Sequence, residues 1–551
     1  MKTYTCKNIR NIALAGHGGS GKTSVAEGLL YKCGEIERMG RVSDGNSVCD
    51  YDPEEIKRKI SLGTSLAYCQ WKDVKINILD TPGQFDFAAG LYEGISAAES
   101  VVIALPAKDG VQVGTIKAYR EAIKHGKATM FVVTRMEEEN SNFYKCLEEL
   151  KTQFGPSICP IVVPFDKYGT VESYINLLEM KAYTYDNGIP TEVPMPASEN
   201  RLKGLRAAMA EAVAETDEEL MMRYFENEGE DFTEAEIVKG LHDGIHKGYI
   251  TPVVCCSGDT LAGIDMMLNT IIYMLPSPDE TGGELCDDGS KVQYASRDTL
   301  EAKVFKTVAD PFVGKLSYIK IVNGTLAAGT EVVNRTTGNL EKPGKLLSMQ
   351  GKKTEDMIEA YAGDIVAATK LSANTGDTLT ASGDETVFAA EKYPVPCFFK
   401  AISAKDKNDE GKISNAIKRM VEEDKTLSYD HNHETHQRIL GGLGEQHLDA
   451  AISKMKAKFG VDVIVSDPII AYRESIRKKV QAEGKHKKQS GGHGQYGHVK
   501  IRLEPNESGK GYEFRNEVVG GAIPKEYIPA VDAGIRGAMA SGVLAGYPVV
   551  D

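Results

Sequence analysis

Short apolar runs alternate with longer amphipathic stretches along the first half of the chain. The apolar runs lie at residues 12–15, 74–79, 100–105, 128–133 and 251–256, and helical periodicity is found at 24–30, 113–125 and 261–275. Buried strands separated by amphipathic helices are typical of an α/β domain with a largely parallel sheet. A charged stretch of helical character at 166–248 interrupts the pattern, and we predict that it is an insertion. Pro276 and Pro278 end the last helix and mark the end of the domain.

The second half of the chain has a different texture. Short β-type runs between residues 300 and 379 are separated by single glycines, which predicts a small antiparallel β-barrel. After Pro394-Val395-Pro396, strand and helix patterns are mixed up to residue 459. We therefore predict an α/β domain at 1–280, a barrel at 281–393, and small α+β domains at 394–470 and 471–551.

Length and composition narrow the class of protein. A chain of 551 residues exceeds the size of one hydrophobic core, and 41% hydrophobic with 26% charged residues is typical of soluble globular proteins. The net charge of −14 argues against a generally basic nucleic-acid coat but is compatible with a local basic surface for RNA. The ten cysteines form no C-x-x-C pair, and no apolar run has the length of a signal peptide or a membrane span. We expect a cytoplasmic monomer that makes no membrane contact.

The strongest chemical signal follows the first apolar run. It consists of Gly16, His17, Gly18, Gly19, Ser20, Gly21, Lys22 and Thr23, between a predicted strand and a predicted helix. Glycines let successive backbone N–H groups converge on a phosphate, and the helix adds the positive end of its dipole. In this arrangement Lys22 reaches the β- and γ-phosphates, and the Thr23 hydroxyl binds Mg²⁺. We predict a nucleoside triphosphate site; an ordinary glycine-rich turn is the alternative.

A second motif ends the next predicted strand, with the residues Asp80, Thr81, Pro82, Gly83 and Gln84. An Asp at this place holds Mg²⁺, and the Gly83 amide meets the γ-phosphate only while that phosphate exists, so the segment is a switch. D-T-P-G is a common turn by itself, but behind a phosphate loop it indicates a GTPase. The polar stretch 43–62 is predicted to close over the nucleotide, with Ser61 as a second hydroxyl ligand of Mg²⁺; a solvated surface loop is the alternative.

The residues that would read the base depart from the usual GTPase pattern. The run at 128–133 leads into Thr134, Arg135, Met136 and Glu137, where GTPases normally carry Asn-Lys-x-Asp. The Glu137 carboxylate can still pair with the guanine N–H groups, but its stem is one methylene longer. Ser257, which follows the strand at 251–256, is predicted to touch the base. The motif leaves both GTP and ATP as candidate nucleotides.

The clearest basic cluster lies near the end of the sequence. Lysines and a histidine lead there into a glycine-rich stretch with one tyrosine. A flexible glycine loop flanked by cations suits contacts with RNA phosphates and bases, although solvated basic loops without a partner are common. The predicted RNA-contact residues are Lys485, Lys487, Lys488, Gln489, Gly491, Gly492, His493, Gln495 and Tyr496.

Taken in order, these motifs resemble those of bacterial elongation factor G over almost the whole chain. The matching stretches are 16–23, 80–83, Asp310-Pro311-Phe312-Val313-Gly314, 441–449, 471–474, 484–497, 511–514 and 523–532. The resemblance implies a GTP-hydrolysing translation elongation factor that binds GTP and Mg²⁺ and acts in translocation. It implies the ribosome as partner, through ribosomal RNA, the decoding region and the GTPase-activating centre. The implied fold class is multidomain α/β: a P-loop GTPase domain with an insertion, an antiparallel β-barrel and small α+β domains, with 489–497 as a ribosome-facing tip.

Several residues depart from the family pattern, and all lie in the nucleotide site. Gly19 replaces an Asp, Ser61 replaces a Thr, and Gln84 replaces the His that positions the attacking water. Gln can also position the water, so Gln84 and Lys22 are the predicted catalytic residues. We expect a divergent paralogue of elongation factor G. Because the family pattern continues beyond Asp551, we also expect this sequence to be C-terminally incomplete.

Other functions are compatible with the same motifs. A ribosome recycling factor or a ribosome protection factor would use the same domains. A non-hydrolysing, nucleotide-gated ribosome-binding protein would explain the altered nucleotide site. A P-loop kinase is a further alternative, but it has no need of the switch motif at 80–83 or of a barrel.

Overall fold

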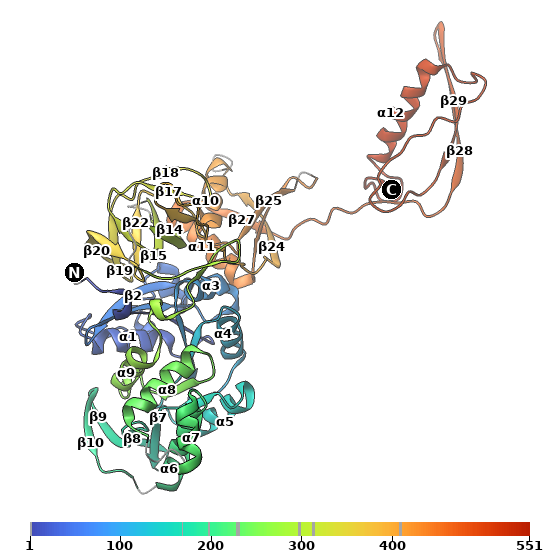
Figure 1. The fold of residues 1–551 in the computed structure, drawn as a ribbon. Coiled ribbons are helices and arrows are strands. Elements are labelled where there is room, and N and C mark those ends of the chain that lie inside the picture. The colour runs from blue at the N-terminus through green and yellow to red at the C-terminus, as the bar shows by residue number, and fades with distance from the viewer. Residues whose placement is uncertain are drawn as a thin grey trace. The chain divides into compact units, whose positions relative to one another are not determined.

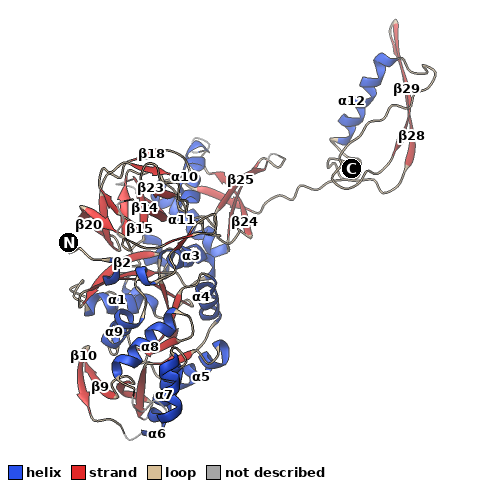
Figure 2. Cartoon of the chain, in the orientation of Figure 1, coloured by secondary structure: helices blue, strands red, loops and turns tan. Residues whose placement is uncertain are grey.

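The structure is a computed structural model that describes residues 3–167, 169–196, 199–227, 232–295, 299–310, 314–406, 410–432 and 434–551. The chain forms two compact units, Met1–Asp430 with Arg438–Ser466, and His431–Gln437 with Asp467–Asp551 (Figure 1). Its helices and strands are distinguished in Figure 2. The multidomain α/β fold class predicted from the sequence is confirmed.

A seven-stranded sheet forms the centre of the first domain, with strand order β2-β3-β1-β4-β5-β11-β6. Neighbouring strands are parallel except for the antiparallel pair β2 and β3. β1, β4, β5 and β11 are buried along their whole length, which explains their continuous apolar runs. The strands are β1 Ile9–Gly16, β2 Ser65–Trp71, β3 Val74–Asp80, β4 Ser100–Pro106, β5 Ala128–Thr134, β6 Ile158–Pro160 and β11 Thr251–Cys255.

Helix α4, Val113–Lys124, packs against this sheet through a narrow face of small residues, whereas α5, Phe143–Phe154, and α9, Ile264–Met274, bury larger apolar side chains. The buried residues of α4 are Gly114, Thr115, Ala118 and Ala122, which recur at helical spacing. The other helices are α1 Lys22–Lys32, α2 Pro53–Arg58 and α3 Ala88–Ala97. The parallel topology places the loops after β1, β3, β5 and β11 at one edge of the sheet, where all the predicted nucleotide motifs lie.

The insertion at 166–248 was predicted to be helical, and this is wrong for its first part. A four-stranded antiparallel sheet of order β10-β9-β8-β7 comes first. These strands carry charged residues on an exposed face, so their pattern does not stand out from that of a polar helix. The signal that was missed is the hairpin turn Asn187-Gly188, where both residues have positive φ (49° and 75°). The elements are β7 Val162–Lys167, β8 Thr170–Asn176, β9 Lys181–Asp186, β10 Ile189–Val193, α6 Glu199–Ala214, α7 Glu218–Asn227 and α8 Glu234–His246.

The second domain is built on an eight-stranded antiparallel sheet of order β18-β17-β23-β14-β15-β22-β19-β20. Its core consists of aliphatic side chains such as Val304, Ile319, Val366 and Leu379. Pro311, Phe312 and Val313 of the family motif lie outside the described residues. The strands are β14 Glu301–Asp310, β15 Gly314–Asn323, β17 Val332–Asn334, β18 Leu340–Glu341, β19 Leu346–Gln350, β20 Lys353–Met357, β22 Ile365–Thr369 and β23 Thr378–Thr380, with the short pairs β12 Glu284–Leu285 with β13 Lys291–Val292 and β16 Thr325–Ala327 with β21 Glu359–Tyr361.

The third domain is a four-stranded sheet of order β25-β26-β24-β27 covered by two helices. Helix α10, Glu410–Glu423, buries Ile413 and Ile417, and helix α11, Glu445–Phe459, buries Leu448 and Met455 in the same core. The strands are β24 Phe398–Ala404, β25 Ser428–Asn432, β26 Gln437–Gly442 and β27 Val463–Ser466.

The C-terminal unit contains a long hairpin, β28 Val480–Ser490 with β29 His493–Leu503, and helix α12 Ile528–Met539. The sequence predicted a flexible glycine loop at 489–497, and this is wrong for most of the segment. Ser490 pairs with His493, so that only Gly491 and Gly492 form the turn. Gly491 has φ +72°, which explains a glycine at that position.

Buried ion pairs join the first domain to the second. Lys75 of β3 places its Nζ 2.7 Å from Asp364 Oδ1, and the two side chains are 2% and 9% exposed. Lys320 of β15 is fully buried and pairs with Glu99, which precedes β4. Breaking a buried ion pair leaves a charge without compensation in a medium of low dielectric.

We expect Lys75→Ala to lower the free energy of unfolding by about 3 kcal/mol or more, because the Asp364 carboxylate would stay buried without its partner. Lys345→Ala is the matched control. Its Nζ lies at the same 2.7 Å from Asp356, but both side chains are 66% exposed. That pair should contribute less than about 1 kcal/mol. Urea unfolding of both variants measures the difference, and equal effects would contradict the account.

Candidate nucleotide and switch site

The loop between β1 and α1 adopts a conformation that only glycine-rich sequence permits. Gly16 has φ +135°, and a Cβ there would lie 2.3 Å from the carbonyl oxygen of Ala104. Lys22 Nζ donates to the carbonyl oxygens of His17 at 2.9 Å and Gly16 at 3.2 Å, so the ammonium lies within the curve of the loop. Burial lowers the pKa of Lys22 to about 8, although the nearby carboxylates of Asp80 and Asp50 oppose this shift. Loop, ammonium and helix N-terminus together have the arrangement of an anion-binding cradle.

Two buried carboxylates face this cradle. The Thr23 hydroxyl donates to Asp80 Oδ2 at 2.7 Å. Burial raises the pKa of Asp80 to about 7, and the like charge of Asp50 adds to the rise. Asp80 Oδ1 and Asp50 Oδ2 are both buried and have no hydrogen-bond partner among the described residues. Oxygen atoms of this kind beside a hydroxyl are the ligands and neighbours that Mg²⁺ prefers, so the residues fit a Mg²⁺ ion.

Ser61 belongs to the same cluster. Its side chain is half-buried and hydrogen-bonds to Asp50. The segment that contains Ser61 is held in place by Glu55, whose Oε1 accepts from the backbone N–H of Leu62 at 2.9 Å and Gly63 at 3.3 Å. The predicted switch stretch 43–62 therefore folds back over the cradle, and its second half is ordered by helix α2.

The motif after β3 lies directly against the phosphate loop. A Cβ at Gly83 would lie 2.5 Å from Lys22 Nζ and 2.7 Å from the backbone nitrogen of Gly18, so the close approach requires glycine. The exposed Gln84 side chain extends over the loop, and a Cβ at Gly18 would lie 2.7 Å from Gln84 Nε2. Thr81 and Pro82 are buried and support the turn; the Thr81 hydroxyl donates to the carbonyl oxygen of Leu14.

The predicted base-reading corner also reaches the phosphate loop. The Thr134 hydroxyl donates to the carbonyl oxygen of Ser20 at 2.7 Å. Arg135 has φ +57° and pairs with Glu138, Met136 is buried, and the Glu137 side chain is exposed. Ser257 is fully buried; its Oγ accepts from the backbone N–H of Thr260, and its own N–H donates to the carbonyl oxygen of Ala262, so the structure does not present it on the surface as predicted. The sheet topology thus gathers the predicted residues of the first domain at one edge.

The predicted RNA-contact residues lie in the hairpin of the C-terminal unit. Lys485 and Lys487 alternate with Lys488 along β28, so the cations project from both faces of the ribbon. Tyr496 pairs with Lys487 across the strands and is 66% exposed. Gln489, Gln495 and the turn glycines are exposed as well. The side chain of His493 lies outside the described part of the structure.

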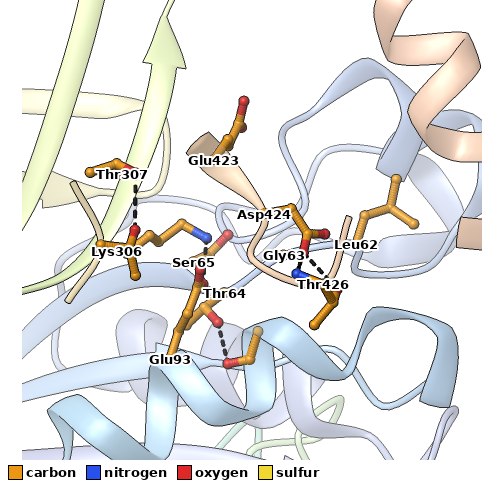
Figure 3. A network of polar contacts seen from close by, with 12 residues as sticks. Leu62, Gly63, Thr64, Ser65, Glu93, Lys306, Thr307, Glu423, Asp424 and Thr426 are labelled. Carbon is orange, nitrogen blue, oxygen red and sulfur yellow. Dashed lines mark hydrogen bonds and ion pairs between the residues drawn. The ribbon is translucent and has the colours of Figure 1, made fainter. Parts of the chain in front are cut away.

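A cavity lies behind the switch segments of the first unit. Its wall combines Leu62 and Gly63, residues of α3 and β14, and residues 423, 424, 447 and 454 of the third domain. Figure 3 shows the polar side chains around it; Lys306 Nζ lies 2.9 Å from Glu93 Oε2, and Thr426 donates to Asp424. The second and third domains thereby contact the segments that surround the phosphate loop.

In the described part of the chain, no group of three His, Cys, Asp or Glu side chains is arranged to bind a metal ion. None of the described helices has the length and apolar character needed to cross a membrane.

Comparison with known proteins gives matches along nearly the whole chain. The matching family models are the Elongation factor Tu GTP binding domain at residues 7–277, Elongation factor G domain 2 at 299–382, Elongation Factor G domain III at 393–467 and Elongation factor G domain IV at 468–551. A crystal structure of a protein from Thermus thermophilus is 35% identical with a TM-score of 0.85, and the match covers 99% of this chain and 80% of that chain.

Asp50 is a candidate residue that the sequence did not single out, and it generates a prediction. We expect Asp50→Asn to lower the Mg²⁺-dependent affinity for GTP by about 10-fold to 100-fold, because the variant removes a negative charge from the metal environment. Asp44→Asn is the control, because Asp44 lies in the same segment and its side chain is not buried. Calorimetry at several Mg²⁺ concentrations measures the effect. Equal Mg²⁺ dependence in both variants would contradict the assignment.

Proposed function

The chain belongs to the elongation factor G family, and on this premise we propose that it is a GTP-hydrolysing factor that acts on the ribosome in translocation. Its domain architecture is that of a translational GTPase. The observation that carries the proposal is the position of Gln84 over the phosphate loop, beside Lys22 and Gly83. A segment that senses the terminal phosphate there also carries a side chain able to orient water.

In this proposal the residues Gly16 to Thr23 hold the phosphates of GTP through backbone N–H groups. Lys22 neutralises charge on the β- and γ-phosphates as it develops during hydrolysis. The Gly83 N–H donates to the γ-phosphate, and this contact ends when phosphate leaves. Residues 80–84 are therefore held in one arrangement while GTP is bound. With GDP they lose the contact of the Gly83 N–H with the γ-phosphate.

Mg²⁺ would be held by the hydroxyls of Thr23 and Ser61, with Asp80 and Asp50 at the edge of the metal environment. When bound, the ion would neutralise phosphate charge. The unpartnered oxygens of Asp50 and Asp80 support this role, because a buried carboxylate is costly without a cation or a donor.

Gln84 takes the place of the family's catalytic His. Its amide can accept a hydrogen bond from the attacking water and donate another, which fixes the water in line with the γ-phosphorus. GTP and water then give GDP and phosphate. Such positioning demands a defined side-chain orientation, and the proximity of Gln84 to Gly18 supports it.

The base would lie between residues 134–137 and the loop at Ser257. Glu137 is exposed and free to turn toward a guanine edge, and Thr134 keeps the corner attached to the phosphate loop. We assign guanine as the preferred base because a carboxylate pairs with two guanine N–H groups and repels the acceptor edge of adenine.

The ribosome is the proposed partner of the C-terminal hairpin. Its lysines lie on both faces of the ribbon, which suits a site surrounded by phosphates better than a flat surface. Tyr496 offers an exposed ring on which a base can stack. Ribosome recycling and ribosome protection would use the same contacts and are distinguished by assays of the respective step.

We expect ribosomes to stimulate GTP hydrolysis by the purified protein, and Gln84→Ala to slow it by about 100-fold or more at saturating GTP, because the water loses its positioning group. GTP affinity should stay the same. Single-turnover phosphate release measures the hydrolysis rates of the wild type and of the variant. A wild-type protein that binds ribosomes but never releases phosphate would point instead to a non-hydrolysing, nucleotide-gated factor.

Gly18→Ala tests the orientation of Gln84 without removing it. Gly18 does not have positive φ, so alanine introduces no backbone strain, but its Cβ would lie 2.7 Å from Gln84 Nε2. We expect hydrolysis to slow by about 10-fold or more with unchanged GTP affinity, because displacement of a reacting group is costly. In a Gln84→Ala background the same change should have no further effect, and an additive loss would refute the link.

A further inference from the structure

Helix α11 of the third domain receives its N-terminal cap from the switch segment of the first domain. The N-cap residue of α11 is Gly444, which has no side chain to accept a hydrogen bond. Asp86 Oδ2 instead accepts from the backbone N–H of Gln446 at 3.0 Å and of His447 at 3.4 Å. The first N–H groups of a helix have no partner within the helix, and a carboxylate is among the best caps.

The glycine at 444 is explained by this contact. A Cβ at Gly444 would lie 2.3 Å from Asp86 Oδ2 and 2.5 Å from Asp86 Oδ1. The carboxylate therefore occupies the space that the side chain of an ordinary N-cap residue would fill. The chain separation of 360 residues makes this a contact between domains and not a local turn.

The start of α11 is itself rigid. His447 is buried, its Nδ1 accepts from the backbone N–H of Leu443 at 3.1 Å, and its Nε2 donates to Asp424 Oδ2 at 2.9 Å. Phe87 is buried against the His447 ring, with 5.8 Å between ring centroids. Asp424 also belongs to the polar network shown in Figure 3. Asp86 therefore meets a fixed surface on the third domain.

Gln84 lies two residues before Asp86. The residue between them, Phe85, contacts residues of the first domain. The Phe85 ring contacts His17, with centroids 5.9 Å apart, and Lys117 Nζ lies 3.9 Å from its centroid. The short segment 84–87 thus has one anchor on the first domain and one on α11. Both anchors add to the contacts of Thr81 that hold the turn before Gln84.

We propose that Asp86 is a positioning residue for GTP hydrolysis, which acts by tying the segment of Gln84 to the N-terminus of α11. This inference rests on the proposed function. It makes the third domain part of the hydrolytic apparatus, without a residue of that domain touching the nucleotide. Helix α11 also contacts the other switch segment, since Lys454 pairs with Asp52 at 3.4 Å and Ser453 donates to Glu54 at 2.7 Å.

The test uses the full chain with Asp86→Ala, Asp86→Asn and Glu445→Ala. Asp86→Ala removes the cap, whereas Asp86→Asn keeps an acceptor oxygen. Glu445→Ala is the matched control, because it removes an exposed negative charge from the same helix terminus without removing the cap. Circular dichroism melting establishes that each variant is folded, and hydrogen exchange and single-turnover GTP hydrolysis with ribosomes are then compared.

We expect Asp86→Ala to speed exchange of the amides of Gln446 and His447 by about fivefold, the loss of one cap. Its hydrolysis rate at saturating GTP should fall by about 10-fold or more with unchanged GTP affinity. Asp86→Asn should keep amide exchange and the hydrolysis rate close to those of the wild type, and Glu445→Ala should match the wild type in both quantities.

Faster exchange with a wild-type hydrolysis rate would overturn the positioning role, as would an equal loss in Glu445→Ala or a weaker GTP affinity that accounts for the slower rate. These results leave the proposed function intact. A wild-type protein that hydrolyses no GTP with ribosomes overturns the proposed function and the positioning role together, and the two failures are therefore distinguishable.

Discussion

The burial of two carboxylates beside the phosphate loop is the constraint on which the first domain depends. Asp50 and Asp80 lie near Lys22 and Thr23, each with an oxygen that has no hydrogen-bond partner among the described residues. Burial and mutual repulsion both disfavour the charged forms, as the raised pKa of Asp80 reflects. On the proposed function, a divalent cation would reverse this balance by compensating both charges at once, and nucleotide, metal and switch segments would stabilise one another.

Polar contacts connect the segments around this cluster with the second and third domains. Glu55 connects helix α2 with the backbone of Leu62 and Gly63, and burial raises its pKa to about 7. The same α2 region contacts helix α11. On the other side, Lys306 of the second domain pairs with Glu93 of α3. Each contact is directional and requires its partner at a defined distance, and together these contacts join the switch segments to both neighbouring domains.

The sequence predicted those parts of the site whose chemistry is local. Gly16 to Thr23 and Asp80 to Gln84 are recognisable because a phosphate loop and its switch need particular residues in consecutive positions. Asp50 and Asp86 were not recognised, because each is an isolated acid whose meaning comes from a partner far away in the chain. Gly444 leaves α11 without a side-chain cap of its own, but α1 and α9 also begin after a glycine, so this pattern alone does not point to Asp86. The strands of the insertion were overlooked because charged, exposed positions stand beside buried ones in β7, β8 and β9, and those of the C-terminal hairpin because the ribbon is exposed; polar patterns of both kinds are ambiguous.

The departures from the family pattern are best understood as a set. A glutamine at position 84 is longer than the imidazole it replaces and must lie across the loop, and Gly18 provides the space because it has no Cβ. Thr134 is shorter than the asparagine expected there, yet its hydroxyl reaches the carbonyl oxygen of Ser20 and keeps the base corner joined to the loop. Ser61 retains the hydroxyl of the threonine it replaces and lacks only the methyl group. Gln84, Thr134 and Ser61 thus each keep a polar group where the family pattern has one, whereas at Gly19 no described residue beyond its two chain neighbours has an atom within 4 Å of the Cβ position.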